Sequence, residues 1–130
     1  MKTRRHVLAL AGLLVTAGLA PVWAGEETPF SDAAFEAARK AGQPVLIAIS
    51  APWCPICRAQ KPILEKLAAE PRFKSLRIFD IDFDSQKDLL KRFDARMQST
   101  LIAYKGATEV GRSVGETQQE WIEGLLEKTL

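Results

Sequence analysis

The protein has 130 residues, of which only two are cysteine and one is histidine, and its formal net charge is +2. Hydrophobic residues make up 47% of the chain, an ordinary share for a protein with a globular core. This length suits one domain rather than several. Removal of the basic residues Lys2, Arg4 and Arg5 at the amino terminus would leave a charge of −1, which argues against a nucleic-acid or membrane-surface partner, because either would need a basic patch.

The amino-terminal residues have the pattern of a secretory signal peptide. Basic residues precede an apolar run from Val7 to Ala20, and Ala24 is the small residue expected before a cleavage site. The run is shorter than the roughly 20 residues that span a membrane. We therefore predict a signal peptide over residues 1–24 and one exported domain over residues 25–130, with no stable membrane insertion after cleavage. An uncleaved anchor is the alternative.

Cleavage would change the chemistry of the mature chain. It removes Lys2, Arg4 and Arg5 and no acidic residue, so that 15 basic and 16 acidic residues remain. The Arg4-Arg5 pair also resembles a twin-arginine export signal. His6 is lost as well, and it is the only histidine. Without imidazole, the mature domain has no Cys-His catalysis and no Cys/His zinc site.

The first part of the mature chain leads to a buried strand. Residues 25–30 form a polar lead-in, and Ser31 then caps a helix that Gly42 ends. Residues 45–49 are a short, continuous apolar run, which is typical of a central strand buried on both faces. This strand leads directly to the two cysteines.

Helices and strands continue to alternate after the cysteines. We predict helices over residues 54–69 and 86–93, strands over residues 76–81, 100–104 and 109–114, and a last helix whose stripe of Trp121, Ile122, Leu125 and Leu126 faces the core. Right-handed crossovers make the first strands parallel. The chain is therefore predicted to be an α/β protein of three layers, with a mixed central sheet flanked by helices.

The sequence Trp53-Cys54-Pro55-Ile56-Cys57 holds both cysteines. Two cysteines with this spacing can be a catalytic dithiol, half of a metal site or a structural disulfide. A bridge within one helical turn encloses too few residues to stabilise the chain much, which argues against a purely structural role.

The order of the elements, the Trp-Cys-x-x-Cys between the first strand and the second helix, and the length of the mature chain together resemble the thioredoxin family. Pro62 extends the resemblance, since thioredoxins also have a proline at this place in the helix. Because Leu64 and Leu67 continue the apolar period beyond Pro62, we expect the helix to run through it with a kink.

The resemblance implies a thioredoxin-like fold and a thiol-disulfide oxidoreductase that needs no organic cofactor. Its partners would be protein thiols and disulfides, together with a redox partner that recycles the dithiol, and we expect a monomer in an oxidising compartment, the periplasm.

The position of each cysteine predicts its role. Cys54 at the first turn of a helix has free backbone N–H groups and the positive end of the dipole beside its sulfur, which favours the thiolate. Cys57, one turn further on, can attack a mixed disulfide on Cys54 and release the partner. We therefore predict that Cys54 is the attacking sulfur and Cys57 the resolving one.

Residues beside the cysteines are predicted to shape the site. In the family, the residue at Trp53 is a flat apolar wall that helps to dock a partner, although a core tryptophan is equally plausible. Pro55 costs the helix little at its first turn but removes one N–H donor from the Cys54 sulfur. Ile56 brings no charge.

Two positions depart from the family in the proton chemistry of the site. Ala48 stands where thioredoxins have a buried aspartate that accepts the proton of the resolving thiol. Asp80 falls where they have the lysine that pairs with it. Because a partly buried carboxyl has a raised pKa, Asp80 is a candidate replacement for the missing proton acceptor, unless it is solvated.

A third departure concerns the loop before the hairpin strand. Gln98-Ser99 places Ser99 at the position of the family's cis-proline. A cis bond before serine costs roughly 3 kcal/mol, so we expect a trans bond and a reshaped loop. The Ser99 hydroxyl could then bond Cys54, or the sulfurs could be open to another ligand.

The metal alternative uses the same two thiols. Cu(I) prefers soft ligands, so a copper-binding or copper-delivery domain could use Cys54 and Cys57 with a thioether from Met97, although methionine more often fills gaps. The mature chain cannot close a tetrahedral zinc site alone, and no metal is assigned to it.

Overall fold

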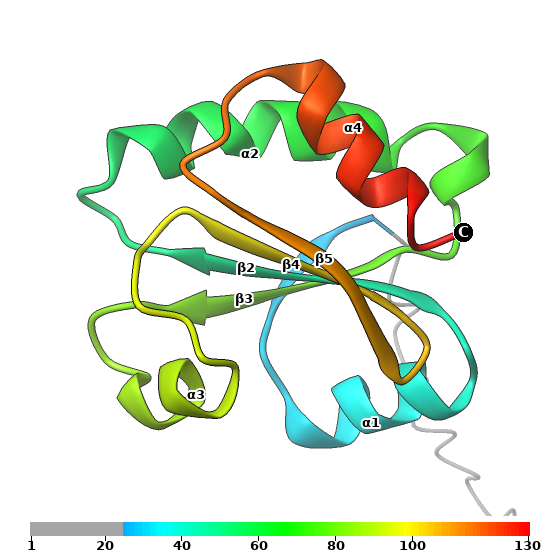
Figure 1. Ribbon diagram of the computed structural model, residues 1–130, viewed down its shortest axis with the longest axis horizontal. Helices are drawn as coiled ribbons and strands as arrows, with labels where there is room; N and C mark the ends of the chain where they lie inside the picture. The colour runs from blue at the N-terminus through cyan, green and yellow to red at the C-terminus, as the bar shows by residue number, and fades with distance from the viewer. Residues whose placement is uncertain (1–24) are drawn as a thin grey trace, which may run out of the picture.

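The computed structural model describes residues 25–130, so the predicted signal peptide over residues 1–24 lies outside the described residues. The described chain forms one sheet with helices on both faces (Figure 1). In chain order its elements are β1 (Glu27–Pro29), α1 (Asp32–Lys40), β2 (Pro44–Ser50), α2 (Pro55–Ala68), the 3₁₀ helix η1 (Pro71–Phe73), β3 (Arg77–Asp82), α3 (Lys87–Arg92), β4 (Thr100–Lys105), β5 (Thr108–Val114) and α4 (Gln119–Glu127).

The sheet has five strands in the order β1-β3-β2-β4-β5. β1, β3 and β2 run parallel, whereas β4 and β5 are antiparallel to their neighbours, so the predicted mixed sheet is confirmed. β2 is the central strand, and its residues 45–49 are all buried. Burial on both faces explains why this strand reads as a continuous apolar run.

The helices divide into two layers, α2 and α4 above the sheet and α1 and α3 below it in Figure 1. Side chains alternate along each strand, so Leu46, Ala48 and Ile78 pack in the cluster under α2 and α4. Ile47 and Phe79 pack with residues of α1 and α3 on the opposite face. The site residues on β2 and β3 therefore lie on the face that α2 covers.

The prediction that residues 25–30 form only a polar lead-in is wrong. Glu27–Pro29 is an edge strand that pairs parallel to β3, with Glu27 opposite Ile78. Three residues are too few to show an alternating pattern, and the partner strand lies about fifty residues further along the chain. β1 places an acidic side chain beside β3.

The prediction that Trp121 faces the core is also wrong. Its side chain is 67% exposed, whereas Ile122, Leu125 and Leu126 are buried. Neighbouring residues of a helix point about 100° apart, so a stripe that includes both Trp121 and Ile122 is wider than the face that α4 buries.

Helix α2 carries the dithiol and runs through Pro62 to Ala68, as predicted. Its apolar face packs under α4, with Leu64 and Leu67 buried. Within residues 25–130, no helix is both long enough and apolar enough to cross a membrane.

Candidate active site

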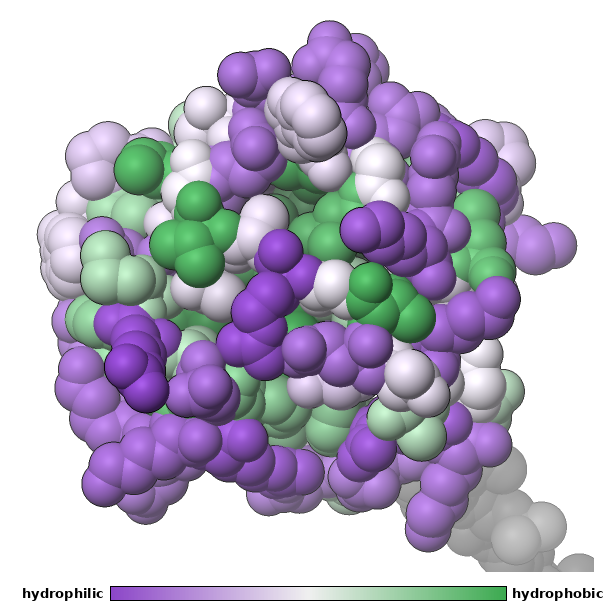
Figure 2. Space-filling view, in the orientation of Figure 1, coloured by the Kyte–Doolittle hydropathy of each residue, from purple (hydrophilic) through white to green (hydrophobic). Residues whose placement is uncertain are grey.

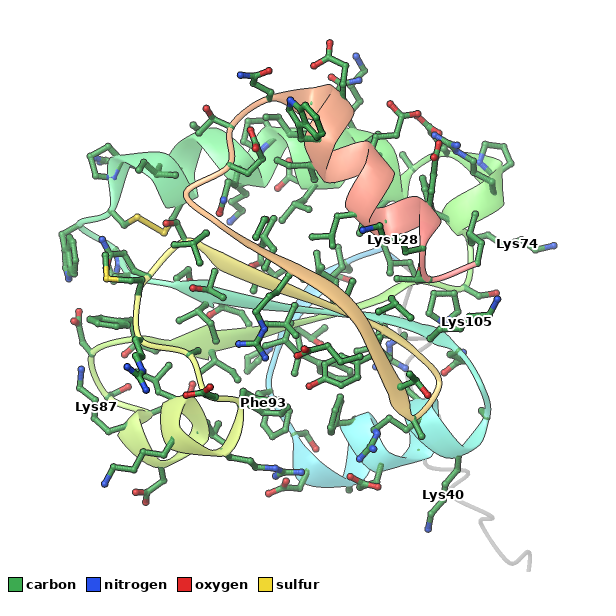
Figure 3. All side chains as sticks on the ribbon, viewed as in Figure 1. Lys40, Lys74, Lys87, Phe93, Lys105 and Lys128 are labelled. Atoms are coloured by element: carbon green, nitrogen blue, oxygen red, sulfur yellow. A yellow bond between two sulfur atoms is a disulfide. The ribbon has the colours of Figure 1, made fainter. Side chains whose placement is uncertain are left out.

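A disulfide joins Cys54 and Cys57 at the start of α2, with their Cα atoms 5.3 Å apart. Figure 3 shows it as the yellow bond beside the first turn of this helix. Cys54 is the N-cap residue, and its sulfur accepts a hydrogen bond from the backbone N–H of Cys57 at 3.1 Å. This N–H and the helix dipole would stabilise a thiolate on Cys54 after reduction.

The two cysteines differ in their surroundings. Cys54 is only 1% exposed, whereas Cys57 is half-buried and lines a cleft between α2 and the edge of the sheet. A partner can reach the Cys54 sulfur only if the groups around it move. The attacking role of Cys54 and the resolving role of Cys57 stay predictions.

Trp53 stands on the surface beside the disulfide. Its ring is 53% exposed and packs edge-on against Phe83, and its indole N–H donates to the Asp84 carboxylate at 2.9 Å. These two contacts with the loop after β3 hold the ring in place. Trp53 is therefore an ordered surface residue beside the disulfide and not a core residue. Sequence reasoning did not assign either contact to the site.

Other exposed apolar side chains belong to the same end of the molecule. Ile56 in the first turn of α2 and Met97 in the loop before β4 are both exposed, and so is Pro55. The exposed Met97 fills no gap in the core. On the face shown in Figure 2, apolar side chains lie scattered among polar ones and do not form one broad patch.

Ser99 follows a trans peptide bond, as predicted, because residues 25–130 contain no cis bond. Its φ is 61°, in the left-handed region, and its side chain is buried. Its N–H donates to the carbonyl of Ile49 at 2.8 Å. The hydroxyl donates to the carbonyl of Gln98, so the alternative in which it bonds Cys54 is not what this structure shows.

Gln60 holds the same loop, and sequence reasoning missed it. It lies one turn after Cys57 and is buried, and its side-chain amide donates to the carbonyl of Ser99 at 3.2 Å and to that of Glu116 at 2.9 Å. A glutamine in the middle of an amphipathic helix reads as a surface residue, because only the fold brings these two loops over it.

The cleft beside Cys57 has a volume of about 750 Å³ and is lined by residues of β1, β2, α2 and β3. Ala48 lies in its wall, paired with Asp80 on the neighbouring strand. The small side chain of Ala48 brings no carboxyl group to this cleft, and the acidic groups that line it come from β1 and the residue before it, from α2 and from β3.

Asp80 is half-buried in this cleft and accepts a hydrogen bond from the Ser50 hydroxyl. Glu27 of β1 lies beside it. Burial first, and then the charge of Asp80 and a hydrogen bond with it, raise the pKa of Glu27 from 4.5 to about 7. Glu27 was missed in the sequence because it falls in the unrecognised strand.

The residues and their arrangement can be compared with known proteins. Residues 27–128 match the family model for thioredoxin. The chain belongs to the thioredoxin family.

The match extends over most of the thioredoxin fold. The chain is 30% identical over 100 residues to the thioredoxin of Alicyclobacillus acidocaldarius subsp. acidocaldarius, covering 77% of this chain and 94% of that one. It is 32% identical over 93 residues to the bifunctional thioredoxin reductase/thioredoxin of Mycobacterium leprae (strain TN), covering 71% of this chain but only 20% of that protein. The crystal structure of Trxlp from Edwardsiella tarda EIB202 has a TM-score of 0.75 and 44% identity, covering 78% of this chain and 98% of that one.

The predicted thioredoxin-like fold is therefore confirmed, and the protein is a thiol-disulfide oxidoreductase with a Cys-x-x-Cys pair. Within this thioredoxin fold, the dithiol lies at the start of α2, and Ala48 and Asp80 lie in the wall of the cleft beside Cys57.

Proposed function

We propose that this chain is exported to the periplasm and exchanges disulfides with other proteins through Cys54 and Cys57, with Cys54 as the attacking sulfur. The observation that carries the proposal is the Cys54 sulfur at the N-cap of α2, where the N–H of Cys57 donates to it. The signal peptide predicted over residues 1–24 supports export, and the pairing of the cysteines is compatible with an oxidising compartment.

In the reducing direction, the Cys54 thiolate attacks a partner disulfide and forms a mixed disulfide, releasing one partner thiolate. Cys57 then loses its proton and attacks the sulfur of Cys54, so that the Cys54–Cys57 disulfide forms and the second partner thiolate leaves. The partner gains two electrons and the dithiol loses two. Asp80, in the cleft that Cys57 lines, is the proposed acceptor of the Cys57 proton.

The partner surface is proposed to be the apolar side chains beside the disulfide. Trp53 is held by its contacts with Asp84 and Phe83, and Ile56 of α2 and Met97 of the loop before β4 are both exposed. Pro55 and the polar residue Gln98 are proposed to border this apolar surface. The name of the Mycobacterium leprae relative joins a reductase to a thioredoxin, which supports a separate reductase as the partner that recycles this dithiol.

Trapping on a cysteine variant tests the proposal. In Cys57→Ser the second attack cannot occur, so we expect protein partners to stay on Cys54 as mixed disulfides that a reductant releases. The variant is incubated with periplasmic and cytoplasmic extracts, and captured proteins are identified by mass spectrometry. Cys54→Ser is the matched control, and we expect it to capture at least tenfold less.

Capture by Cys54→Ser instead would contradict the assignment of the attacking sulfur. Capture from the cytoplasmic extract alone would contradict the periplasmic location. If neither variant captures a partner and the reduced wild type binds one equivalent of Cu(I), the copper-binding alternative replaces the proposal. Residues 25–130 hold no cluster of three or more His, Cys, Asp or Glu side chains that could bind a metal ion.

A further inference from the structure

Two carboxyl groups from different strands meet in the cleft beside Cys57. Glu27 comes from β1 and Asp80 from β3, and both side chains lie on the sheet face that α2 covers. The charge of Asp80 and a side-chain interaction with it both raise the pKa of Glu27, so the two carboxyl groups lie within interaction range of each other. Neither residue occupies the position on β2 where the resemblance places the family's single aspartate, which is Ala48 here.

The resolving sulfur and this pair each contact one of two neighbouring residues of β2, Ile49 and Ser50. The Cys57 sulfur lies 4.0 Å from the carbonyl oxygen of Ile49. The hydroxyl of Ser50, the next residue, donates a hydrogen bond to Asp80, and Asp80 in turn interacts with Glu27. Cys57, Ser50, Asp80 and Glu27 all line the same cleft.

We propose that Glu27 and Asp80 act together as the proton acceptor for the Cys57 thiol. This inference rests on the proposed function and adds Glu27 to it as a second member of the acceptor. In the resolving step, the S–H bond of Cys57 breaks and its proton passes to the carboxylate pair. The freed electron pair forms the bond to the Cys54 sulfur, and the partner leaves as a thiolate.

The proton affinity of the pair suits this task. A general base works best when its pKa is close to the working pH, and the pKa of Glu27 is raised to about 7. Two ionised carboxylates repel each other, so the fully ionised pair gains by accepting one proton. An isolated exposed carboxylate, with a pKa near 4.3, would be a much weaker base.

Other charged groups around the pair adjust its proton affinity. Lys61 of α2 faces Glu27 and lowers the pKa of this carboxyl, while Glu65, one turn further along α2, raises it. Arg58 of α2 and Asp82 of β3 also line the cleft. Removing the Lys61 charge should therefore shift the titration of Glu27 to higher pH.

The test follows the resolving step by itself in a single turnover. Reduced protein is mixed with an excess of an aromatic disulfide that releases a coloured thiolate. Release of the first coloured thiolate reports the formation of the mixed disulfide on Cys54. Release of the second thiolate reports the attack by Cys57. In the wild type we expect the second rate to rise with pH around a midpoint near 7.

In Glu27→Gln we expect the rate of the second release, measured above this midpoint, to fall by roughly a hundredfold, the lower end of the contribution that a general base typically makes. The remaining rate should rise only at more alkaline pH, as the Cys57 thiol ionises by itself with a pKa near 8.5. Asp80→Asn should give the same loss, and the double variant should lose little more, because the two groups act as one unit. Lys61→Met should move the wild-type midpoint upward.

Glu26→Gln is the matched control, since Glu26 is exposed and directly precedes Glu27, just before β1. It should keep the wild-type profile. If Glu27→Gln also keeps the wild-type pH profile of the second release, the inference is wrong. If only Asp80→Asn changes this profile, Asp80 acts without Glu27. Absence of the first release in the wild type would instead contradict the proposed function. Thermal unfolding of each variant separates a lost proton acceptor from a lost fold.

Discussion

At the scale of single residues, Ser99 shows how a departure from the family reshapes the site. Its left-handed φ and its N–H bond to Ile49 are both impossible for proline, which fixes φ near −65° and has no N–H. The side-chain amide of Gln60 donates a hydrogen bond to the carbonyl of Ser99. The backbone of this loop therefore does not accommodate a proline at position 99.

Ser99→Pro should destabilise the protein by about 3 kcal/mol or more, because it loses the bond to Ile49 and cannot adopt the native backbone. Ser99→Gly is the matched control: glycine adopts a positive φ freely, so its stability should stay within about 1 kcal/mol of the wild type. Chemical denaturation of the oxidised proteins measures both. A Ser99→Pro protein as stable as the wild type would contradict this description of the loop.

At the scale of elements, the edge strand β1 is attached to β3 next to the acid pair. The pKa of Glu27 is raised in the folded protein, so folding binds a proton between the unfolded pKa of 4.5 and the folded pKa of about 7. The stability from this group is fully present below pH 4.5 and is lost as the pH rises through 7. Above that pH, the ionised pair weakens the contact between β1 and β3.

Glu27→Gln should remove this pH dependence, since an amide has no charge to repel Asp80. We expect the wild type to lose stability between about pH 5 and pH 8, and the variant to lose clearly less over the same range. Urea denaturation at the two pH values measures the difference. Glu26→Gln is the control for the loss of one charge. Equal losses of stability in the wild type and in Glu27→Gln would contradict the destabilising repulsion between ionised Glu27 and Asp80.

The elements that the sequence predicts well are those with long apolar patterns. The buried run of β2, the helix through Pro62 and the hairpin all lie within one or two residues of their predicted bounds. β1 is too short to show a pattern.

The residues of the site differ in the same way in how far the sequence predicts them. The cysteines were found from their motif and Asp80 from the resemblance to the family, whereas Glu27, Ser50 and Gln60 belong to the site only through contacts between distant segments.

At the scale of the whole molecule, one three-layer domain supports a small redox site at the end of its central strand (Figure 1). β2 delivers the chain to the cysteines, α2 presents the Cys54 sulfur at its N-terminus, and β1 and β3 bring carboxyl groups to the Cys57 side. The central claim is that the Cys54–Cys57 bond opens and closes reversibly as a catalytic dithiol and is not a fixed structural bridge.

The equilibrium of this disulfide with a series of glutathione redox buffers tests that claim most directly. The fraction oxidised is measured by trapping free thiols with an alkylating reagent, whose added mass counts them. We predict a reversible two-electron transition, with the same midpoint from the reduced and the oxidised side, inside the range of about −270 to −120 mV covered by thioredoxins and related oxidoreductases. A disulfide that no biological dithiol reduces would contradict the account.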